Sequence, residues 1–158
     1  MTRPILTILA ILTITSCRQP TPLTEREKAS IVENVRQTLD NYYNDIRKSG
    51  LTAEFKYLDN SSEFFWVPPG YSNSISYDSV ATLLKESAPK YRSIANSFER
   101  LLIIPLTDEH ATYTGQLKST MTDTSGKVVT FSLVETGVLI KRKDGWKLLN
   151  GQTSILNQ

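Results

Sequence analysis

The spacing of apolar residues changes at Pro89, and this change limits the folds open to the chain. Before Pro89, apolar residues recur every three or four positions, which is typical of helices with one buried face. After it, runs rich in aliphatic and β-branched residues predict strands over 93–106, 111–122, 128–141 and 146–155. Helices followed by an antiparallel meander predict an α+β domain, in which N-terminal helices pack on one face of a curved antiparallel sheet.

The first helix has the clearest signals in the chain. Thr24 and Glu27 have the spacing of a capping box, in which a hydroxyl and a carboxylate bond each other's backbone amides. Gly50 follows the helix as a stop signal. A helix over 25–48 is therefore predicted, and its core-facing residues are Ile31, Val35, Leu39, Tyr42 or Tyr43, and Ile46.

Shorter elements fill the space between this helix and the strands. A second short helix is expected within 51–58, a strand over 64–67, and a helix from Tyr77 to Pro89. Turns of the hairpin type are predicted at Asp123-Thr124-Ser125-Gly126 and at Lys143-Asp144-Gly145. The length that remains after residue 16 is enough for one domain with its own core, and we expect a single domain over 24–158.

The first 16 residues predict a cleaved export signal. Arg3 precedes a dozen mostly apolar residues, too few for a membrane-spanning helix of about 20 residues. Ile14-Thr15-Ser16-Cys17 resembles the bacterial lipobox, with Cys17 as the lipidated first residue of the mature chain. A polar, proline-containing tether over 17–23 then joins the lipid to the domain. The alternative is an ordinary signal peptide that ends near a free cysteine.

A lipid on Cys17 predicts that the domain is anchored to a membrane of the cell envelope. Arg18 and Gln19 give no aspartate-type signal for retention at the inner membrane. In a Gram-negative host this favours the outer membrane, with the domain facing the periplasm or the exterior.

Composition argues against several classes of function. The formal net charge is +2 at pH 7, so nothing indicates a nucleic-acid partner. His110 and Cys17 are the single histidine and the single cysteine, and we therefore expect neither a histidine or thiolate metal site nor a Ser-His-Asp set. No phosphate-binding glycine loop is present, and no cofactor is expected.

The run from Asp144 to Ser154, Asp-Gly-Trp-Lys-Leu-Leu-Asn-Gly-Gln-Thr-Ser, resembles the last strand of the nuclear transport factor 2-like superfamily. Members of that superfamily include SnoaL-like polyketide cyclases and ketosteroid isomerases. The segment from Phe64 to Gly70 ahead of a helix fits the same order, and the resemblance covers about residues 24–156. It implies a cone-shaped fold whose concave sheet and helices enclose a pocket, but such a fold does not select one function.

Glu135 is the candidate acid or base. Val129, Phe131, Leu133 and Leu139 share its parity on a strand, so its carboxylate is expected within an apolar face, where desolvation raises the pKa. The resemblance adds that ketosteroid isomerases place an acidic group near this strand position. The alternative is a surface glutamate, since both faces of this strand carry aliphatic residues.

Period two along the last strand places Trp146, Leu148, Asn150, Gln152 and Ser154 on one face, and the last three of these are predicted to bind a ligand. In the resembled superfamily, the positions of Asn150 and Gln152 often hold histidines. Amides form hydrogen bonds but do no acid–base chemistry, and this departure weakens the case for catalysis.

Aromatic residues are a second group of candidates. We expect Tyr43, Tyr57 and Trp66 to line a pocket for a partly apolar ligand, although core packing is the alternative for each of them. The isomerases also need an acid near residues 66–69, and none is present there. Asp59 lies too early and is expected in a loop.

Three functions remain open from the sequence. The first is a lipid-anchored module that binds a small, partly apolar ligand without converting it. The second is a SnoaL-like or isomerase-like enzyme with Glu135 as acid or base and Tyr57 or Gln152 steadying an oxyanion. The third is an interaction module that dimerises, or binds a partner, through outward aliphatic residues such as Val134, Val138 and Ile140.

Overall fold

A computed structural model describes residues 22–156. The predicted signal peptide over 1–16, Cys17 and most of the predicted tether over 17–23 lie outside the described residues. Within 22–156, no helix is both long enough and apolar enough to cross a membrane.

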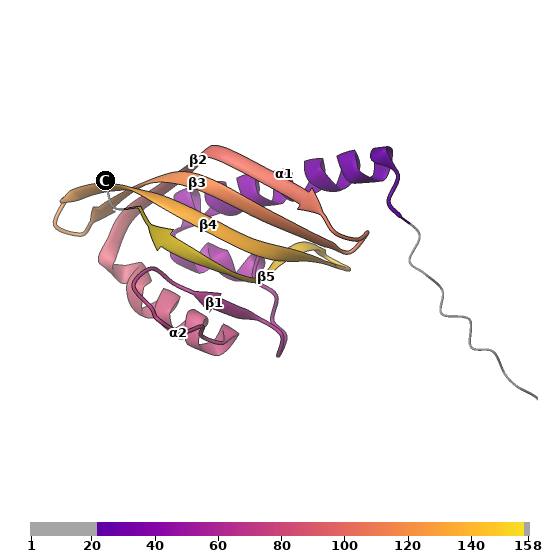
Figure 1. Cartoon of the computed structure of the whole chain (residues 1–158). Coiled ribbons are helices and arrows are strands. Elements are labelled where there is room, and N and C mark those ends of the chain that lie inside the picture. The colour runs from indigo at the N-terminus through magenta and orange to yellow at the C-terminus, as the bar shows by residue number, and fades with distance from the viewer. Residues whose placement is uncertain (1–21, 157–158) are drawn as a thin grey trace, which may run out of the picture.

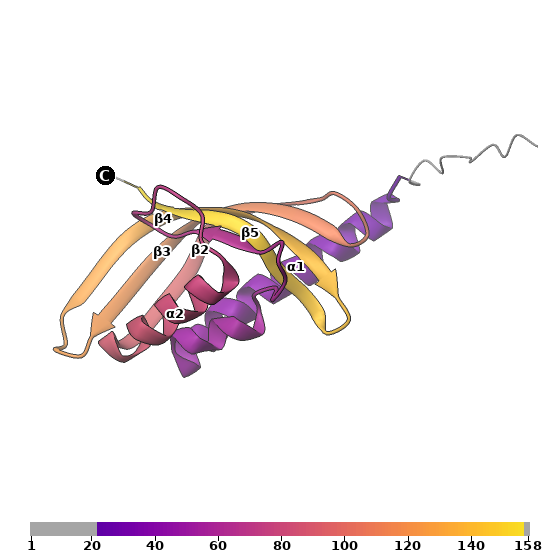
Figure 2. The ribbon, with the colours of Figure 1, turned by 90° about the horizontal axis from the view of Figure 1, so that it is seen from below.

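A layer of helices and a curved sheet make up the fold (Figure 1). The helix α1 (Glu25–Ser49) lies along the concave side of the sheet, and α2 (Tyr77–Ser87) lies on the same side (Figure 2). Two short 3-10 helices follow them, η1 (Leu51–Lys56) and η2 (Ala88–Lys90). The predicted α+β class, with N-terminal helices packed on a curved sheet, is confirmed.

The sheet contains five strands: β1 (Phe65–Val67), β2 (Tyr91–Pro105), β3 (His110–Asp123), β4 (Val128–Arg142) and β5 (Gly145–Ile155). Their spatial order is β1-β5-β4-β3-β2. Strands β2 to β5 form the predicted antiparallel meander, whereas β1 runs parallel to β5, so the sheet is mixed rather than wholly antiparallel. The chain leaves β1 through α2 to the opposite edge of the sheet, and therefore no hairpin sets the direction of β1.

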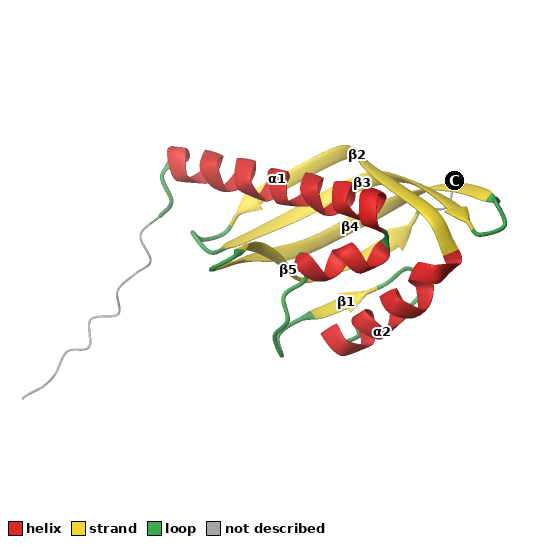
Figure 3. Ribbon diagram, turned by 180° about the vertical axis from the view of Figure 1, so that it is seen from behind, coloured by secondary structure: helices red, strands yellow, loops and turns green. Residues whose placement is uncertain are grey.

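The capping box at the start of α1 is present as predicted. The Glu27 carboxylate accepts a hydrogen bond of 2.8 Å from the Thr24 backbone N–H, and the Thr24 hydroxyl accepts one of 3.3 Å from the Glu27 N–H. At the other end, Gly50 has φ 82°, a conformation that glycine adopts without strain. Between these ends, α1 lies across the strands (Figure 3) and buries Val35, Leu39 and Ile46 against them.

The side of the sheet toward α1 is called the inner face, and the opposite side the outer face. On β3 and β4 the odd-numbered residues point to the inner face, because cross-strand partners share a face and Tyr113, Leu117, Leu133 and Leu139 are buried there. Register shifts at two places in β2 and at one place between β4 and β5 interrupt the ladder. Such bulges bend strands, which accounts for the curvature of the sheet.

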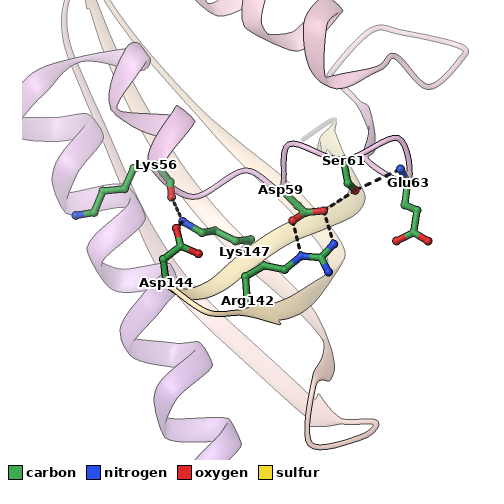
Figure 4. Close-up of polar contacts among 7 residues, drawn as sticks. All are labelled: Lys56, Asp59, Ser61, Glu63, Arg142, Asp144 and Lys147. Carbon is green, nitrogen blue, oxygen red and sulfur yellow. Dashed lines mark hydrogen bonds and ion pairs between the residues drawn. The ribbon is translucent and has the colours of Figure 1, made fainter.

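An ion pair holds the segment after η1 against the end of β4 (Figure 4). Arg142 donates two hydrogen bonds to the Asp59 carboxylate, at 2.7 and 2.8 Å, and the Ser61 hydroxyl donates a third at 2.6 Å. Asp59 lies in a loop as predicted, but it is only 5% exposed. The Arg142 guanidinium holds the pKa of Asp59 below its usual range.

We expect Asp59→Asn to lower the free energy of unfolding at pH 7 by about 2–3 kcal/mol, because it leaves the Arg142 charge without its partner. Since the folded-state pKa of Asp59 is lowered, this stabilisation is present above the unfolded pKa of about 4 and is lost as the pH falls below it. Urea unfolding at pH 3 and pH 7 measures both effects.

Asp144→Asn is the matched control, because Asp144 pairs with Lys147 while 71% exposed. Its expected loss is below about 1 kcal/mol. Equal stabilities for the two variants at pH 7 would show that the Asp59 pair is not a significant link between loop and sheet.

Candidate functional site

A cavity of about 380 Å³ lies between the helices and the inner face of the sheet. Its wall comes from α1, η1, α2, the segment around β1, and the inner faces of β2, β3, β4 and β5. Most of this wall is apolar or aromatic, and Leu58, Phe64, Trp66, Leu84 and Leu148 contribute to it. The size is within the range of small-molecule sites.

Glu135 lies at the inner face of β4 and is 6% exposed. One of its oxygens accepts hydrogen bonds from the hydroxyls of Tyr43, at 2.8 Å, and Tyr113, at 2.6 Å. The other oxygen accepts a bond of 3.1 Å from the hydroxyl of Thr153, its cross-strand partner on β5. Desolvation raises the pKa of Glu135, and the three hydrogen bonds oppose that rise because they favour the charged form.

Alternation along β4 explains why a carboxylate is buried here. Glu135 shares its parity with Leu133 and Leu139, so the register that buries these leucines also buries the acid. The structure buries Glu135 within an apolar face, as the sequence predicts. Its role as an acid or base stays a prediction.

A second carboxylate, Glu54, lines the same cavity from η1 and was not among the predicted site residues. The Tyr42 hydroxyl donates a hydrogen bond of 2.8 Å to one of its oxygens. Desolvation raises the pKa of Glu54 to about 7; the bond from Tyr42 opposes the rise, and the charge of Glu135 adds to it. Leu51 and Leu58 line the cavity too, and this three- and four-residue spacing is the signal that could have identified Glu54.

Trp66 forms part of the cavity wall by lying against two glycines. A methyl group at Gly151 would lie 2.7 Å from the Trp66 ring, and one at Gly137 would lie 3.4 Å from it. The indole N–H donates a hydrogen bond of 3.1 Å to the Thr153 hydroxyl. Because that hydroxyl itself donates to Glu135, Trp66, Thr153 and Glu135 form one hydrogen-bonded chain.

The prediction that Asn150, Gln152 and Ser154 share a face with Trp146 and Leu148 is wrong. The register shifts between β4 and β5, where Val138 pairs with Asn150 but Leu139 pairs with Leu148, and Leu149 is the extra residue. This bulge reverses the parity of the rest of β5. The three residues therefore point to the outer face, and Thr153 points to the cavity in their place.

Two of the three aromatic residues predicted to line the pocket do so, and the third does not. Tyr43 and Trp66 line the cavity. Tyr57 is buried, but its hydroxyl donates to Asp45 at 2.6 Å and it is not part of the cavity wall. Tyr57 packs against α1 instead. Its ring and the ring of Tyr42 meet edge to face, with their centroids 5.5 Å apart.

Neither histidine nor a metal cluster contributes to the site within residues 22–156. His110 starts β3, where its ring contacts the Thr107 hydroxyl at 3.2 Å, and it is not part of the cavity wall. In this same range, no three His, Cys, Asp or Glu side chains are grouped as metal ligands. The chemistry available in the cavity is that of two carboxylates and the hydroxyls around them.

A larger depression of about 760 Å³ lies on the surface between α1 and β2. Its wall is mostly polar and includes Arg36, Arg47 and Lys118. It is more open to solvent than the cavity and has no buried carboxylate. The cavity is therefore the better candidate for binding a small molecule.

Comparisons with known proteins agree with this geometry. A family model described as a SnoaL-like domain matches residues 35–158. No curated protein matches the sequence.

Among solved structures, a protein from Novosphingobium aromaticivorans, provisionally described as a scytalone dehydratase, superposes with a TM-score of 0.75 at 7% identity, over 85% of this chain and 89% of that one. A nuclear transport factor 2-like superfamily protein from Salmonella enterica gives 0.65 at 14% identity, over 82% and 94%. A hexachlorocyclohexane dehydrochlorinase of type 2 gives 0.68 at 9% identity, over 85% and 90%. At these identities the likenesses establish the fold alone.

We expect Glu54→Gln to stabilise the protein at pH 8 by about 1–3 kcal/mol and to leave its stability at pH 4 nearly unchanged. A carboxyl group whose folded-state pKa is raised binds its proton more tightly in the folded state, so it destabilises the fold as the pH rises from about 4.5 to about 7. Glutamine removes that ionisation and still accepts the bond from Tyr42. Urea unfolding of both proteins across this pH range measures the difference.

Glu33→Gln is the control, since Glu33 is exposed on α1, and no pH-dependent gain is expected for it. A Glu54→Gln protein that is less stable than the wild type at pH 8 would contradict the claim that the ionised Glu54 carboxylate lowers the free energy of unfolding.

Proposed function

Because this chain belongs to the SnoaL-like domain family, we propose that it binds a small, partly apolar ligand in the cavity below α1 and does not convert it. The observation that carries the proposal is an apolar cavity of about 380 Å³ with two carboxylates on its wall. An apolar body packs against the leucines and aromatic rings, and a polar group of the ligand meets the carboxylates.

The hydrogen bonds of Glu135 support binding over turnover. Its two oxygens accept three hydrogen bonds from protein hydroxyls, so they hold Glu135 as an acceptor with little freedom to exchange a proton with a ligand. In the described residues, the wall of the cavity contains no histidine that titrates near neutral pH.

A lipid anchor gives this binding a location. The proposed lipid on Cys17 attaches the domain to a membrane of the cell envelope, and the outer membrane is favoured by Arg18 and Gln19 in a Gram-negative host. A domain held there meets ligands of the periplasm or of the exterior.

An enzyme is the second candidate, with Glu135 as acid or base. It is favoured by the raised pKa of Glu135 and by a pKa of about 7 for Glu54, since a group that titrates near neutral pH exchanges protons efficiently. Two proteins of the same fold are named as a dehydrochlorinase and, provisionally, as a dehydratase. In this alternative Tyr43 and Tyr113 take the part that the sequence suggested for Tyr57 or Gln152, because both hydroxyls contact the acid and Tyr43 lines the cavity.

Dimerisation through the outer face is the third candidate. Phe65 on β1 and Leu102 and Ile104 on β2 are exposed there, and Val134 and Val138 of β4 are half-buried between them. Ile140, named with the valines from sequence, is 7% exposed and so has little area left to bury.

To test the binding function, the purified protein is incubated with a cell extract, dialysed and studied by native mass spectrometry. We expect one retained small molecule per chain, and none for Leu83→Trp, whose indole fills the cavity from α2. Thr82→Trp, at the exposed neighbouring position, is the control that should retain it.

The same preparation separates the first two candidates. A retained molecule whose mass stays constant supports binding without conversion. A product that forms with the wild type but not with Glu135→Gln supports the enzyme, and the lack of any retained molecule contradicts both.

For the third candidate, multi-angle light scattering gives the mass in solution. A dimer through the outer face should show about twice the chain mass, and Leu102→Glu should return it to a monomer because a charge is then placed in the interface. A monomeric mass of the wild type at high concentration would exclude this dimer.

A further inference from the structure

The charged groups on the wall of the cavity all have the same sign. Glu54 and Glu135 are its charged residues, and no lysine, arginine or histidine lines it within the described part of the chain. Three lysines lie on or beside η1 but not on the cavity wall. Lys56 ends η1, Lys147 donates to the Lys56 carbonyl at 2.6 Å, and Lys85 of α2 lies over the ring of Phe55, 5.7 Å from its centroid. A ligand therefore meets carboxylates with no protein cation between them.

The donors around the carboxylates are already used. The hydroxyls of Tyr42, Tyr43, Tyr113 and Thr153 donate to Glu54 or Glu135, and the Trp66 indole N–H donates to Thr153. These bonds satisfy the protein's own hydroxyl groups and leave none of them to donate to a ligand.

Acceptors, in contrast, remain free. The bond from Tyr42 reaches Oε2 of Glu54, and no protein group in 22–156 donates to Oε1. Asn96 also lines the cavity, and its buried side-chain oxygen accepts no hydrogen bond within this range. The polar atoms left free beside Glu135 and Glu54 and at Asn96 are therefore acceptors, which a ligand with N–H donors satisfies. The hydroxyls of Tyr71, Tyr91 and Ser87, elsewhere on the wall, are the donors that a ligand still meets.

The aromatic residues of the wall suit a positive charge as well. Phe64, Trp66 and the tyrosines 42, 43, 71 and 91 all line the cavity. Faces of such rings attract cations, and this attraction is stronger where water is excluded.

We propose that the cavity selects a small apolar amine in its protonated form, with the ammonium group donating to Oε1 of Glu54 and the apolar body packed against Trp66 and α2. This inference rests on the proposed binding function and names its ligand class. The charge of Glu54 favours an ammonium over a neutral donor as the ligand group. Removing an ammonium from water costs several kcal/mol, and a facing carboxylate offsets this cost whereas a neutral acceptor does not.

The opposite polarity is the competing possibility. A protonated Glu54 is itself a donor, and it would then bind a ligand with a carbonyl oxygen. The two cases differ in the sign of the pH dependence, because the pKa of Glu54 is about 7. An amine binds better once Glu54 is ionised above that pH, whereas a ketone binds better below it.

The titratable groups that face Glu54 do not reverse this sign. They are Tyr42 and Tyr43 of α1, Glu135 of β4 and, bonded to Glu135, Tyr113 of β3, and burial raises the pKa of all three tyrosines. The residues of α2 that line the cavity, Val80, Leu83, Leu84 and Ser87, do not titrate.

Equilibrium dialysis with three probes of nearly equal shape tests the inference: 1-naphthylmethylamine, 1-naphthalenemethanol and 1-acetonaphthone. At pH 8 the amine should bind the wild type at least about 10-fold more tightly than the alcohol. Its affinity should rise about 3- to 10-fold between pH 6 and pH 8, which follows the ionisation of Glu54.

Glu54→Gln should bring the amine and the alcohol to within about 3-fold of each other at pH 8, whereas the exposed control Glu33→Gln should keep the full preference. If Glu54→Gln does not fold, the wild-type pH series still decides, because it needs no variant.

Two results would overturn the inference. One is an alcohol or ketone that binds at least as tightly as the amine at pH 8, and the other is an amine affinity that falls between pH 6 and pH 8. In both, a probe still binds and the cavity keeps its proposed binding function. If none of the probes binds and the extract yields no retained molecule, the binding function fails together with the inference.

Discussion

The carboxyl group of Glu135 is buried where α1 meets the sheet, and no cation of the described residues faces it. The arrangement of the side chains around it depends on supplying hydrogen bonds to its two oxygens. Glu135 receives hydroxyl groups from α1, β3 and β5, so the acid joins three elements that are distant in sequence. Removing a carboxylate from water is costly unless its oxygens accept several hydrogen bonds. The positions of Tyr43, Tyr113 and Thr153 therefore follow from Glu135 as much as from apolar packing, and the helix cannot shift along the sheet without breaking one of these bonds.

The two acids of the cavity differ in how completely the protein satisfies them. Glu135 accepts three hydrogen bonds and belongs to the joint between helix and sheet. Glu54 accepts one, from Tyr42, and lies on a short 3-10 helix that can tolerate a change of partner more easily than a central strand. This division suggests that Glu135 maintains the shape of the site, while Glu54 is the acid that a ligand meets.

Periodic features were predictable from the sequence, and features that interrupt a period were not. The capping box, the buried face of α1 and the meander follow from local spacing, and the resemblance to the nuclear transport factor 2-like superfamily is confirmed. The burial of Glu135 follows from alternation with Leu133 and Leu139. Asn150, Gln152 and Ser154 were placed on the wrong face because the bulge at Leu149 has no local signature. Glu54 was missed because its signal is short, namely its spacing from the two leucines Leu51 and Leu58 that line the cavity with it. The pairing of Asp59 with Arg142 depends on residues far apart in the chain.

The bulge at Leu149 has a consequence for how proteins with this strand diverge. Substitutions on β5 change one side chain at a time, but closing the bulge while keeping all the residues would pair Leu149 with Val138 and turn every later side chain of the strand over at once. The amides and the serine would then enter the cavity, and Thr153 would leave Glu135 and Trp66. A change of register at constant length thus exchanges the polar lining of the site for another that the strand already encodes, so members of the family with and without this bulge are expected to differ in chemistry even where their sequences agree.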